Sequence, residues 1–380
     1  MKKHSRLLSI LLLAALLCLS ACTQRGEEPA AVEETPAPVM ADPTEVPEAP
    51  VAPEATEATE ETEETVTPEP TETPVAADTT LRDPLTGKAL TEAGSALRPF
   101  AVQMNNHQDA LPQCGISNAA VIYEMPEEGI TRMTAIYPQD LACEHLGSVR
   151  SARPYHSEVA KSYDAIFVHW GASTRGAESV YQLHANDDVD FCGNASAYSY
   201  REPSRANRAT EHTGFVTIEK LNQFLSDNNR RTTHDGEKDY GFRFSDNVAL
   251  TGGSAQSMKV FFVSKESDFT YSADKGGYTM SQYHGIDYVD GDTNEPVVFR
   301  NVVFLRASFT DESSLASIAL QNAEGAGVLC IDGQQEQITW KHGDYDDCFH
   351  YYLSDGTEAN FGVGRSYICI ISYNDNLVIE

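Results

Sequence analysis

The chain is poor in basic side chains. Its 380 residues contain 27 Lys and Arg against 57 Asp and Glu, which gives a formal net charge of −30. Proteins that bind nucleic acid neutralise its phosphates with Lys and Arg, so this balance argues against nucleic acid as a partner. The deficit is uneven, because residues 23–80 carry 16 acidic side chains against Arg25 alone and account for half of the net charge.

Common metal and hydrolase motifs are missing as well. The sequence has no Cys-x-x-Cys and no His-Glu-x-x-His, the spacings typical of zinc ligands, and no Gly-x-Ser-x-Gly nucleophile motif. We therefore expect neither a metal nor a cofactor.

The eight cysteines are few for a disulfide scaffold of this length. Two of them lie in the first 22 residues, and the rest are Cys114, Cys143, Cys192, Cys330, Cys348 and Cys369. Export permits disulfides, but three cysteines in each half of the folded part leave one over. Buried free thiols and one bridge in each half both remain open.

Residues 1–22 have the pattern of a bacterial lipoprotein signal. Lys2, Lys3 and Arg6 precede the apolar run Leu7–Leu19, and Ser20-Ala21-Cys22 follows. The run is too short for a typical membrane span and ends in small residues, as secretory signals do. We expect Cys22 to be lipidated and to hold the protein on the outer leaflet of the cytoplasmic membrane by its acyl chains.

Residues 23–80 lack aromatic side chains and contain ten of the 18 prolines. Such a segment cannot bury enough apolar surface to offset the entropy of ordering, and its like charges repel one another. The composition predicts a disordered, extended linker that spaces a folded body from the membrane.

The remaining residues predict a mixed α/β (α+β) protein of two domains. Residues 81–250 alternate short β-branched or aromatic runs with helical stretches, which favours a mixed sheet with helices. The helices are expected after Pro154, over Glu178–Leu183 and around Ile218–Leu225. Residues 256–380 contain about six strand-like runs separated by Asp-Gly and similar turns, which predicts a mainly antiparallel β domain.

Arginine is concentrated in the first of these domains. Arg150 and Arg153 bracket a short turn before Pro154, and guanidinium groups near a helix N-terminus suit phosphate or carboxylate. We expect a hairpin-like pairing of Thr131–Tyr137 with Leu146–Arg150 to bring Arg132 close to Arg150. The predicted ligand-binding residues are Asn105, Asn106, Glu124, Arg132, Arg150, Arg153, His169 and Arg205. The alternative is an internal network in which these arginines pair with Glu124, Glu127 or Asp164.

Several segments in this order resemble the YerB-like family of bacterial lipoproteins. The resemblance rests on Arg98-Pro-Phe-Ala-Val with Asn105-Asn106, on Tyr123-Glu124 with Gly129-Ile-Thr-Arg132, on Val149-Arg-Ser-Ala-Arg-Pro154, and on Tyr163-Asp-Ala before His169. The sequence departs from the family pattern at Glu128, which replaces a glycine, and in the stretch Arg208–Thr213. The resemblance covers residues 85–375 and implies an envelope-attached, two-part α/β protein without an assigned activity.

Two classes of function follow. The first is a non-catalytic envelope module that binds an anionic cell-wall or lipid-linked ligand, or an envelope protein, through the arginine-rich site. The second is an enzyme acting on phosphorylated glycan or polyisoprenyl-phosphate substrates. We favour the binding module, because an anion site is visible in the sequence and a complete catalytic set is not.

Overall fold

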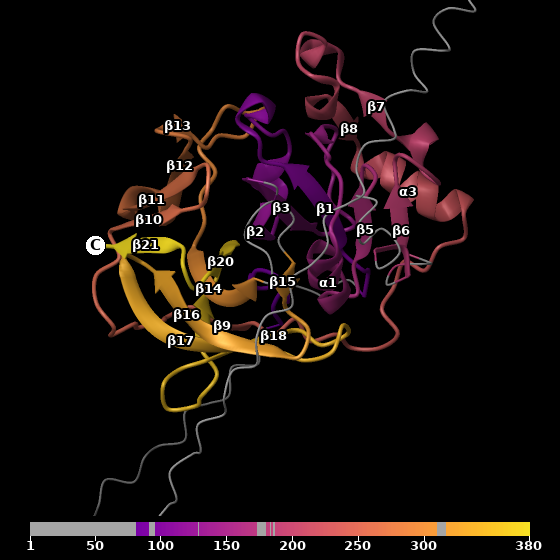
Figure 1. Cartoon of the computed structure of the whole chain (residues 1–380). Coiled ribbons are helices and arrows are strands. Elements are labelled where there is room, and N and C mark those ends of the chain that lie inside the picture. Colours follow the sequence, from indigo (N-terminus) through magenta and orange to yellow (C-terminus); the bar gives the residue numbers. More distant parts are fainter. Residues whose placement is uncertain are drawn as a thin grey trace, which may run out of the picture. The chain divides into compact units, whose positions relative to one another are not determined.

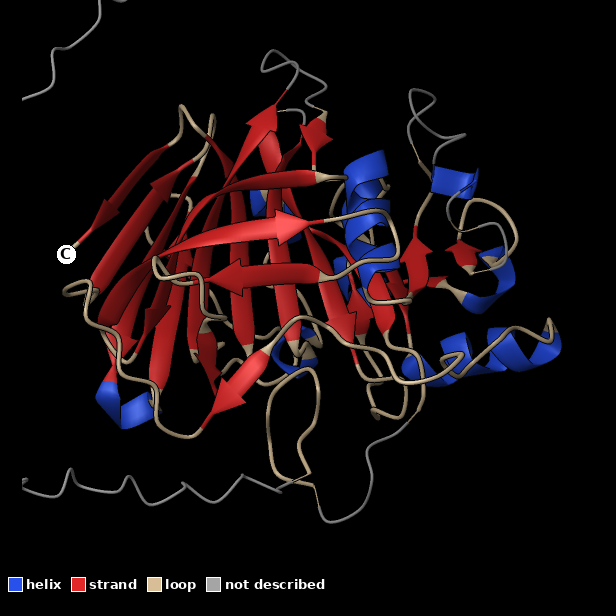
Figure 2. Cartoon of the chain, turned by 90° about the horizontal axis from the view of Figure 1, so that it is seen from below, coloured by secondary structure: helices blue, strands red, loops and turns tan. Residues whose placement is uncertain are grey.

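A computed structural model describes residues 81–90, 96–127, 129–172, 180–182, 184, 187–309 and 317–380. The predicted signal, Cys22 and linker lie outside the described residues, as does part of the expected helix Glu178–Leu183. No helix among the described residues is long and apolar enough to cross a membrane. Strands far outnumber helices among the described residues (Figure 2).

An 11-stranded sheet contains strands from both halves of the described chain (Figure 1). In spatial order its strands are β18 (Phe349–Tyr352), β17 (Gln334–His342), β16 (Ala323–Ile331), β14 (Asn301–Phe309), β20 (Ser366–Ser372), β2 (Val121–Glu127), β3 (Ile130–Tyr137), β1 (Phe100–Asn105), β5 (Ile166–His169) and β6 (Asp188–Asp190), with β15 (Ile318–Ala319) added at β14. The halves meet where β2 and β20 pair in parallel, from Val121 opposite Ser366 to Glu124 opposite Cys369.

A second sheet of five antiparallel strands is formed by the C-terminal half. Its order is β13 (Ile286–Asp287), β12 (Gly277–Gln282), β11 (Glu266–Ser272), β10 (Ser257–Phe261) and β21 (Asn376–Ile379). The strands expected after residue 256 are therefore divided between two sheets. One of them, β20, is buried along its whole length and lies parallel to both of its neighbours, as apolar strands covered on both faces often do.

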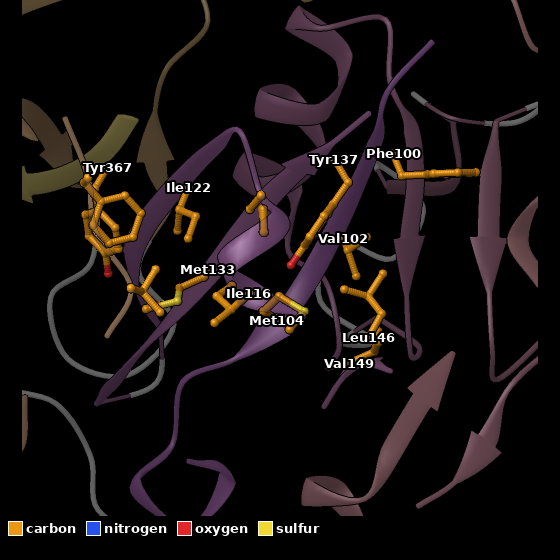
Figure 3. Close-up of a cluster of buried hydrophobic side chains, with 14 of the residues drawn as sticks. Phe100, Val102, Met104, Ile116, Ile122, Met133, Tyr137, Leu146, Val149 and Tyr367 are labelled. Atoms are coloured by element: carbon orange, nitrogen blue, oxygen red, sulfur yellow. The ribbon is translucent and has the colours of Figure 1, made fainter. Parts of the chain in front are cut away.

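Two buried clusters cover the two faces of the large sheet. On one face Val102, Ile122 and Tyr367 pack with Val260 and Phe269 of the five-stranded sheet. Figure 3 shows part of this cluster, with Met104, Met133 and Val149 beside the strands. On the other face Ala101, Tyr123 and Ile368 pack with Tyr155 and Val159 of helix α1. The alternation of neighbouring residues between the faces follows from the two-residue period of a strand.

Two α-helices are described over their whole length, α1 (Pro154–Ser162) and α3 (Ile218–Asp227). Pro154 suits the first helical position because its fixed φ is pre-organised for a helix and the missing N–H would have no partner there. The Thr217 Oγ1 caps α3 by accepting from the Lys220 N–H at 3.0 Å. Two small sheets complete the fold, β4 (Leu146–Gly147), β8 (Gly214–Val216) and β7 (Tyr200–Arg201) in one, and β19 (Asn360–Gly362) with β9 (Arg243–Ser245) in the other.

The expected hairpin between Thr131–Tyr137 and Leu146–Arg150 was wrong. β3 pairs with β2 on one edge and β1 on the other, so it has no edge left for another strand. Leu146–Gly147 pairs instead with β8, and Val149 lies opposite Met104 of β1. The segment that carries the arginines therefore lies beside β1.

Candidate functional site

The carboxyl ends of the parallel strands β1, β5 and β6 lie together at one edge of the large sheet. Residues 148–152 occupy the space between the ends of β1 and β5. The Arg150 N–H donates to the Gln103 carbonyl at 2.7 Å, and the Arg150 carbonyl accepts from the Trp170 N–H at 2.9 Å. Ligands of α/β proteins commonly bind beyond the carboxyl ends of parallel strands. This edge places four predicted site residues near one another, namely Asn105, Arg132, Arg150 and Arg153.

Two of these arginines are held by an internal carboxylate. Glu127 lies 2.6 Å from Arg153 Nε and 3.5 Å from Arg132 Nη1, and all three side chains are buried. The Tyr155 hydroxyl also donates to Glu127. Arg132 further donates to the Ser151 carbonyl at 2.8 Å. The internal network, which was the alternative to an anion site, is therefore present for two of the arginines. Arg132 and Arg153 both pair with Glu127.

Burial and charge around this network shift the pKa values of two neighbours. Desolvation and the Glu127 carboxylate raise the pKa of Tyr155 well above its usual value. Desolvation and the charges of Arg132 and Arg153 lower the pKa of His156 well below its usual value, so its imidazole is neutral. The His156 Nδ1 accepts from the Arg153 N–H at 3.1 Å, which places the ring proton on Nε2.

Arg150 differs from the other arginines in this part of the chain. Its side chain has no hydrogen bond or ion pair with any described residue, although it is half-buried and its Nε is enclosed. Elsewhere in the first half, described arginines donate to carbonyls or pair with carboxylates, as do Arg98, Arg132, Arg153, Arg201, Arg205, Arg208 and Arg231. The guanidinium N–H groups of Arg150 therefore have no acceptor among the described residues and can donate to a ligand.

Asn105 fixes the tautomer of a buried histidine beside Arg150. Its Nδ2 donates to Nδ1 of His212 at 2.9 Å and to the Glu211 carbonyl at 3.1 Å. Its Oδ1 accepts from the His107 N–H at 3.1 Å, so the orientation of the amide is determined. A neutral His212 then carries its proton on Nε2 and offers it as a donor. Desolvation, His107 and Arg150 all lower the pKa of His212.

His107 stacks on this ring and adds a second donor. The ring centroids lie 5.0 Å apart with an interplanar angle of 20°, and Nδ1 of His107 accepts from the Asp109 N–H at 3.1 Å. The neutral His107 ring also carries its proton on Nε2. A hollow of about 500 Å³ lies at the residues that follow His107 in the chain and is lined in part by Asp109, Leu111 and Arg208.

Ligand-type atoms of His107, Asp109 and His212 lie within 4.8 Å of one another, as they do in some metal sites. Metal ions bind a histidine nitrogen along its lone pair, in the plane of the ring. Nδ1 of each ring accepts a hydrogen bond here, so each neutral ring carries its proton on Nε2 and has no lone pair left for a metal ion. The two rings therefore suit donation to an anion better than joint coordination of one cation.

His169 and Arg205 both have their partners inside the protein. His169 lies 2.6 Å from Asp188 through Nε2 and 2.9 Å from the Gly171 carbonyl through Nδ1, and it is fully buried. Arg205 donates to the Ala110 carbonyl at 2.8 Å and to the Pro112 carbonyl, and it stacks on Phe215. Arg208 likewise donates to the Asp109 and Leu111 carbonyls. These arginines hold the loop that follows His107.

Asn106 and Glu124 lie on the opposite face of the sheet from the arginines. Both are fully buried, and Asn106 Nδ2 donates to Glu124 Oε1 at 3.0 Å. Glu124 also pairs with Lys265, which comes from the C-terminal half and is buried too. The eight predicted ligand residues therefore divide between the edge of the sheet and its interior.

Two models of one family match the chain. The N-terminal domain of a protein family of unknown function, DUF3048, matches residues 85–231, and its C-terminal domain matches residues 258–368. The chain belongs to the DUF3048 family. This confirms the resemblance drawn from the sequence.

A relative and a solved structure agree with this assignment. The chain is 29% identical over 280 residues to "Putative lipoprotein YerB" of Bacillus subtilis (strain 168), a match that covers 69% of this chain and 78% of the relative. A crystal structure of YerB from Bacillus subtilis superposes with a TM-score of 0.66 at 24% identity, covering 78% of this chain and 99% of that one. The mixed α/β fold is therefore confirmed, and the relative's name agrees with an envelope lipoprotein.

Two residues with clear structural roles were not among the predicted site residues. His212 was noted only as a general-base candidate, although Asn105 and Arg150 both lie beside it. Lys265 has no motif around it, and its only signal is a charged residue among the apolar Phe261, Phe262 and Val263. Neither contact is local in sequence, so neither followed from spacing.

Proposed function

We propose that this DUF3048 protein binds an anionic group at the carboxyl edge of β1, through Arg150 and the paired imidazoles of His107 and His212. The observation that carries the proposal is the guanidinium of Arg150, which forms no hydrogen bond or ion pair with a described residue. An arginine without an acceptor is a strong site for phosphate or carboxylate, because it offers several donors and a permanent charge.

The surroundings of Arg150 support an anion more than a cation. His107 and His212 each present an Nε2–H group when neutral, and the Asn105 amide keeps the His212 proton at that position. Arg132 and Arg153 add two positive charges to this edge and share the carboxylate of Glu127. Residues 81–380 have a net charge of −18, so this cationic edge stands out from the rest of the folded part.

The ligand class follows from the predicted location. Lipidation at Cys22 would hold the protein on the outer face of the cytoplasmic membrane, behind an extended acidic linker. Anionic groups available there include phosphates and carboxylates of wall polymers and of lipid-linked precursors. We expect the ligand to be one of these rather than a nucleic acid.

The test is a binding panel with the full chain. Thermal shift and calorimetry with phosphate, pyrophosphate and a short-chain polyisoprenyl phosphate should show a stabilising ligand for the wild type. Arg150→Ala should weaken binding at least tenfold. Arg231→Ala is a matched control, because this arginine is also half-exposed but is paired with Asp164, which lies at the amino end of β5, the end opposite to the Arg150 site.

The control should bind as well as the wild type. The proposal fails if no anion in the panel stabilises the wild type, or if Arg150→Ala and Arg231→Ala affect the affinity equally.

A further inference from the structure

Glu124 is the centre of a fully buried polar cluster between the two halves. Its Oε2 accepts from the Tyr367 hydroxyl at 2.7 Å and from the Ser267 hydroxyl at 3.2 Å. Its Oε1 accepts from the Thr131 hydroxyl at 2.6 Å and contacts both Lys265 Nζ and Asn106 Nδ2. Lysine is almost never buried this completely, so a specific role for its amine is to be expected here.

Two of the side chains that contact Glu124 Oε1 have complementary chemistry. Lys265 carries a primary amine, Asn106 a carboxamide, and Glu124 lies in contact with both nitrogens. The Asn106 carbonyl oxygen accepts from Gln113 Nε2 at 3.1 Å. This donor lies where the negative charge would develop if a nucleophile attacked the carboxamide.

We propose that Lys265 and Asn106 are joined by an intramolecular isopeptide bond, formed with Glu124 as the proton carrier. Glu124 first takes a proton from Lys265 Nζ, and the free amine then attacks Cγ of Asn106. The new Cγ–Nζ bond forms as the Cγ–Nδ2 bond breaks. Of the three Nζ protons, one remains in the new amide and two pass to the departing nitrogen, which leaves as ammonium. Glu124 ends as a carboxylate, and no oxidant or cofactor is required.

The surroundings favour each step of this reaction. An ion pair in an apolar interior is costly, so transfer of the proton from Lys265 to Glu124 relieves two buried charges at once. The cluster is enclosed by aromatic rings, with Lys265 Nζ 5.4 Å from the ring centroid of Tyr283 and 5.6 Å from that of Phe262. Glu124 Oε1 contacts both nitrogens and so brings the amine and the carboxamide to one atom, and reacting groups gathered in a rigid core react far faster than free groups do.

The bond would tie the two family segments together. Asn106 belongs to the segment that follows β1, and Lys265 lies between β10 and β11. Asn106 is also held through its backbone carbonyl, which accepts from the Tyr283 hydroxyl at 2.5 Å. Asn105 and His107 flank Asn106, so the cross-link would also anchor the segment that carries part of the anion site. The bond does not depend on that site binding a ligand.

Mass spectrometry of the purified full chain tests the proposal. A tryptic digest should contain one cross-linked species that joins the peptide of Asn106 to a peptide left uncut at Lys265. Its mass should be lower than the sum of the two peptides by one ammonia. In a denaturing gel the cross-linked chain should migrate ahead of an uncross-linked variant.

Three variants show whether the cross-link depends on Lys265 and Glu124. Lys265→Met and Glu124→Gln should both restore the uncross-linked peptides, and Lys259→Met should not, because Lys259 lies on the outer side of the same sheet and pairs with Asp268 at 2.8 Å. If either of the first two variants fails to fold, the wild-type digest still decides the question.

Three results would overturn the proposal. The first is a wild-type digest with ordinary, unlinked Asn106 and Lys265 peptides. The second is a loss of ammonia confined to the Asn106 peptide, which indicates a succinimide. The third is a link from Lys265 to Gln282, whose Oε1 lies 2.6 Å from Nζ, in place of Asn106.

Discussion

Glu127 and Arg153 form a buried ion pair, with 2.6 Å between Arg153 Nε and Glu127 Oε1. Glu127 also faces Arg132, so one carboxylate neutralises part of two guanidinium charges. Removing it takes away the buried carboxylate that both arginines contact and leaves part of their charge uncompensated. We expect Glu127→Ala to lower the free energy of unfolding by about 3–5 kcal/mol, as measured by urea denaturation.

A surface pair provides the comparison for that experiment. Glu358 pairs with Arg243 at 2.8 Å, but both side chains are more than a third exposed. Glu358→Ala should change the free energy of unfolding by less than about 1 kcal/mol. Equal effects of the two substitutions would contradict a special role for Glu127.

The carboxyl of Glu158 on α1 should make the stability of the fold depend on pH. Burial raises the pKa of its carboxyl to about 7. A raised carboxyl pKa means that the folded state binds the proton more tightly than the unfolded state, whose value is close to 4.5. The group therefore costs nothing below about pH 4.5 and destabilises the fold increasingly as the pH rises towards 7.

Replacing Glu158 by Gln removes this titration. We expect Glu158→Gln to be more stable than the wild type by about 2 kcal/mol at pH 8, and to match it near pH 4. Urea unfolding curves at the two pH values measure the difference. An identical effect of the substitution at both values would show that the carboxyl does not titrate between them.

His212 should contribute to anion affinity as a neutral donor. His212→Ala removes the Nε2–H group and the partner of Asn105, and we expect about a tenfold or larger loss of affinity in calorimetry, since hydrogen bonds to charged groups contribute about 1.5–3 kcal/mol. Burial and Arg150 lower the pKa of His212, so this contribution should be the same at pH 7 and pH 8. A contribution that falls steeply between these values would mean that the imidazolium is the bound form.

The six described cysteines are free thiols. Burial raises the pKa of Cys143 and of Cys348 to about 11 and that of Cys114 to about 12, whereas Cys192 is exposed. A thiol reagent at pH 8 should therefore label Cys192 first in the native protein and the others only after denaturation. The melting temperature should not change with reductant. A reductant-sensitive transition would reveal a disulfide.

Lipidation remains a prediction from the sequence. Mass spectrometry of the mature N-terminus should identify an acylated Cys22, and Cys22→Ala should move the protein from the membrane fraction to the medium or periplasm. If the mature N-terminus of the wild type is unmodified, the protein is secreted without a lipid anchor.

The sequence was informative where the signal is local. Pro154, which suits the first position of a helix, predicted α1, and the run of β-branched and aromatic residues around Ile122 predicted a strand. It failed for Arg132, because whether β3 pairs with Leu146–Arg150 depends on which strands take its edges. Only the fold shows that β1 and β2 pair with the two edges of β3.

The arginines show the same division. Their concentration was visible in the sequence, but their roles depend on the partners that each side chain finds. Arg205 contacts carbonyls of a loop more than 90 positions earlier in the chain, whereas the Arg150 side chain forms no hydrogen bond with a described residue. Spacing alone cannot separate an arginine that holds a loop from one that faces a ligand. The role of Glu124 likewise depends on its contact with Lys265, which lies 141 positions later in the chain.

The parallel pairing of β2 with β20 also sets an order of events during folding. β2 spans Val121–Glu127 and β20 spans Ser366–Ser372, and the paired residues Glu124 and Cys369 are 245 positions apart in the chain. Contacts of such long sequence separation slow folding, because the intervening chain must be ordered before they form. The large sheet therefore closes only once β20 is present to pair with β2. Until then β2 has an open edge that can pair with a wrong strand.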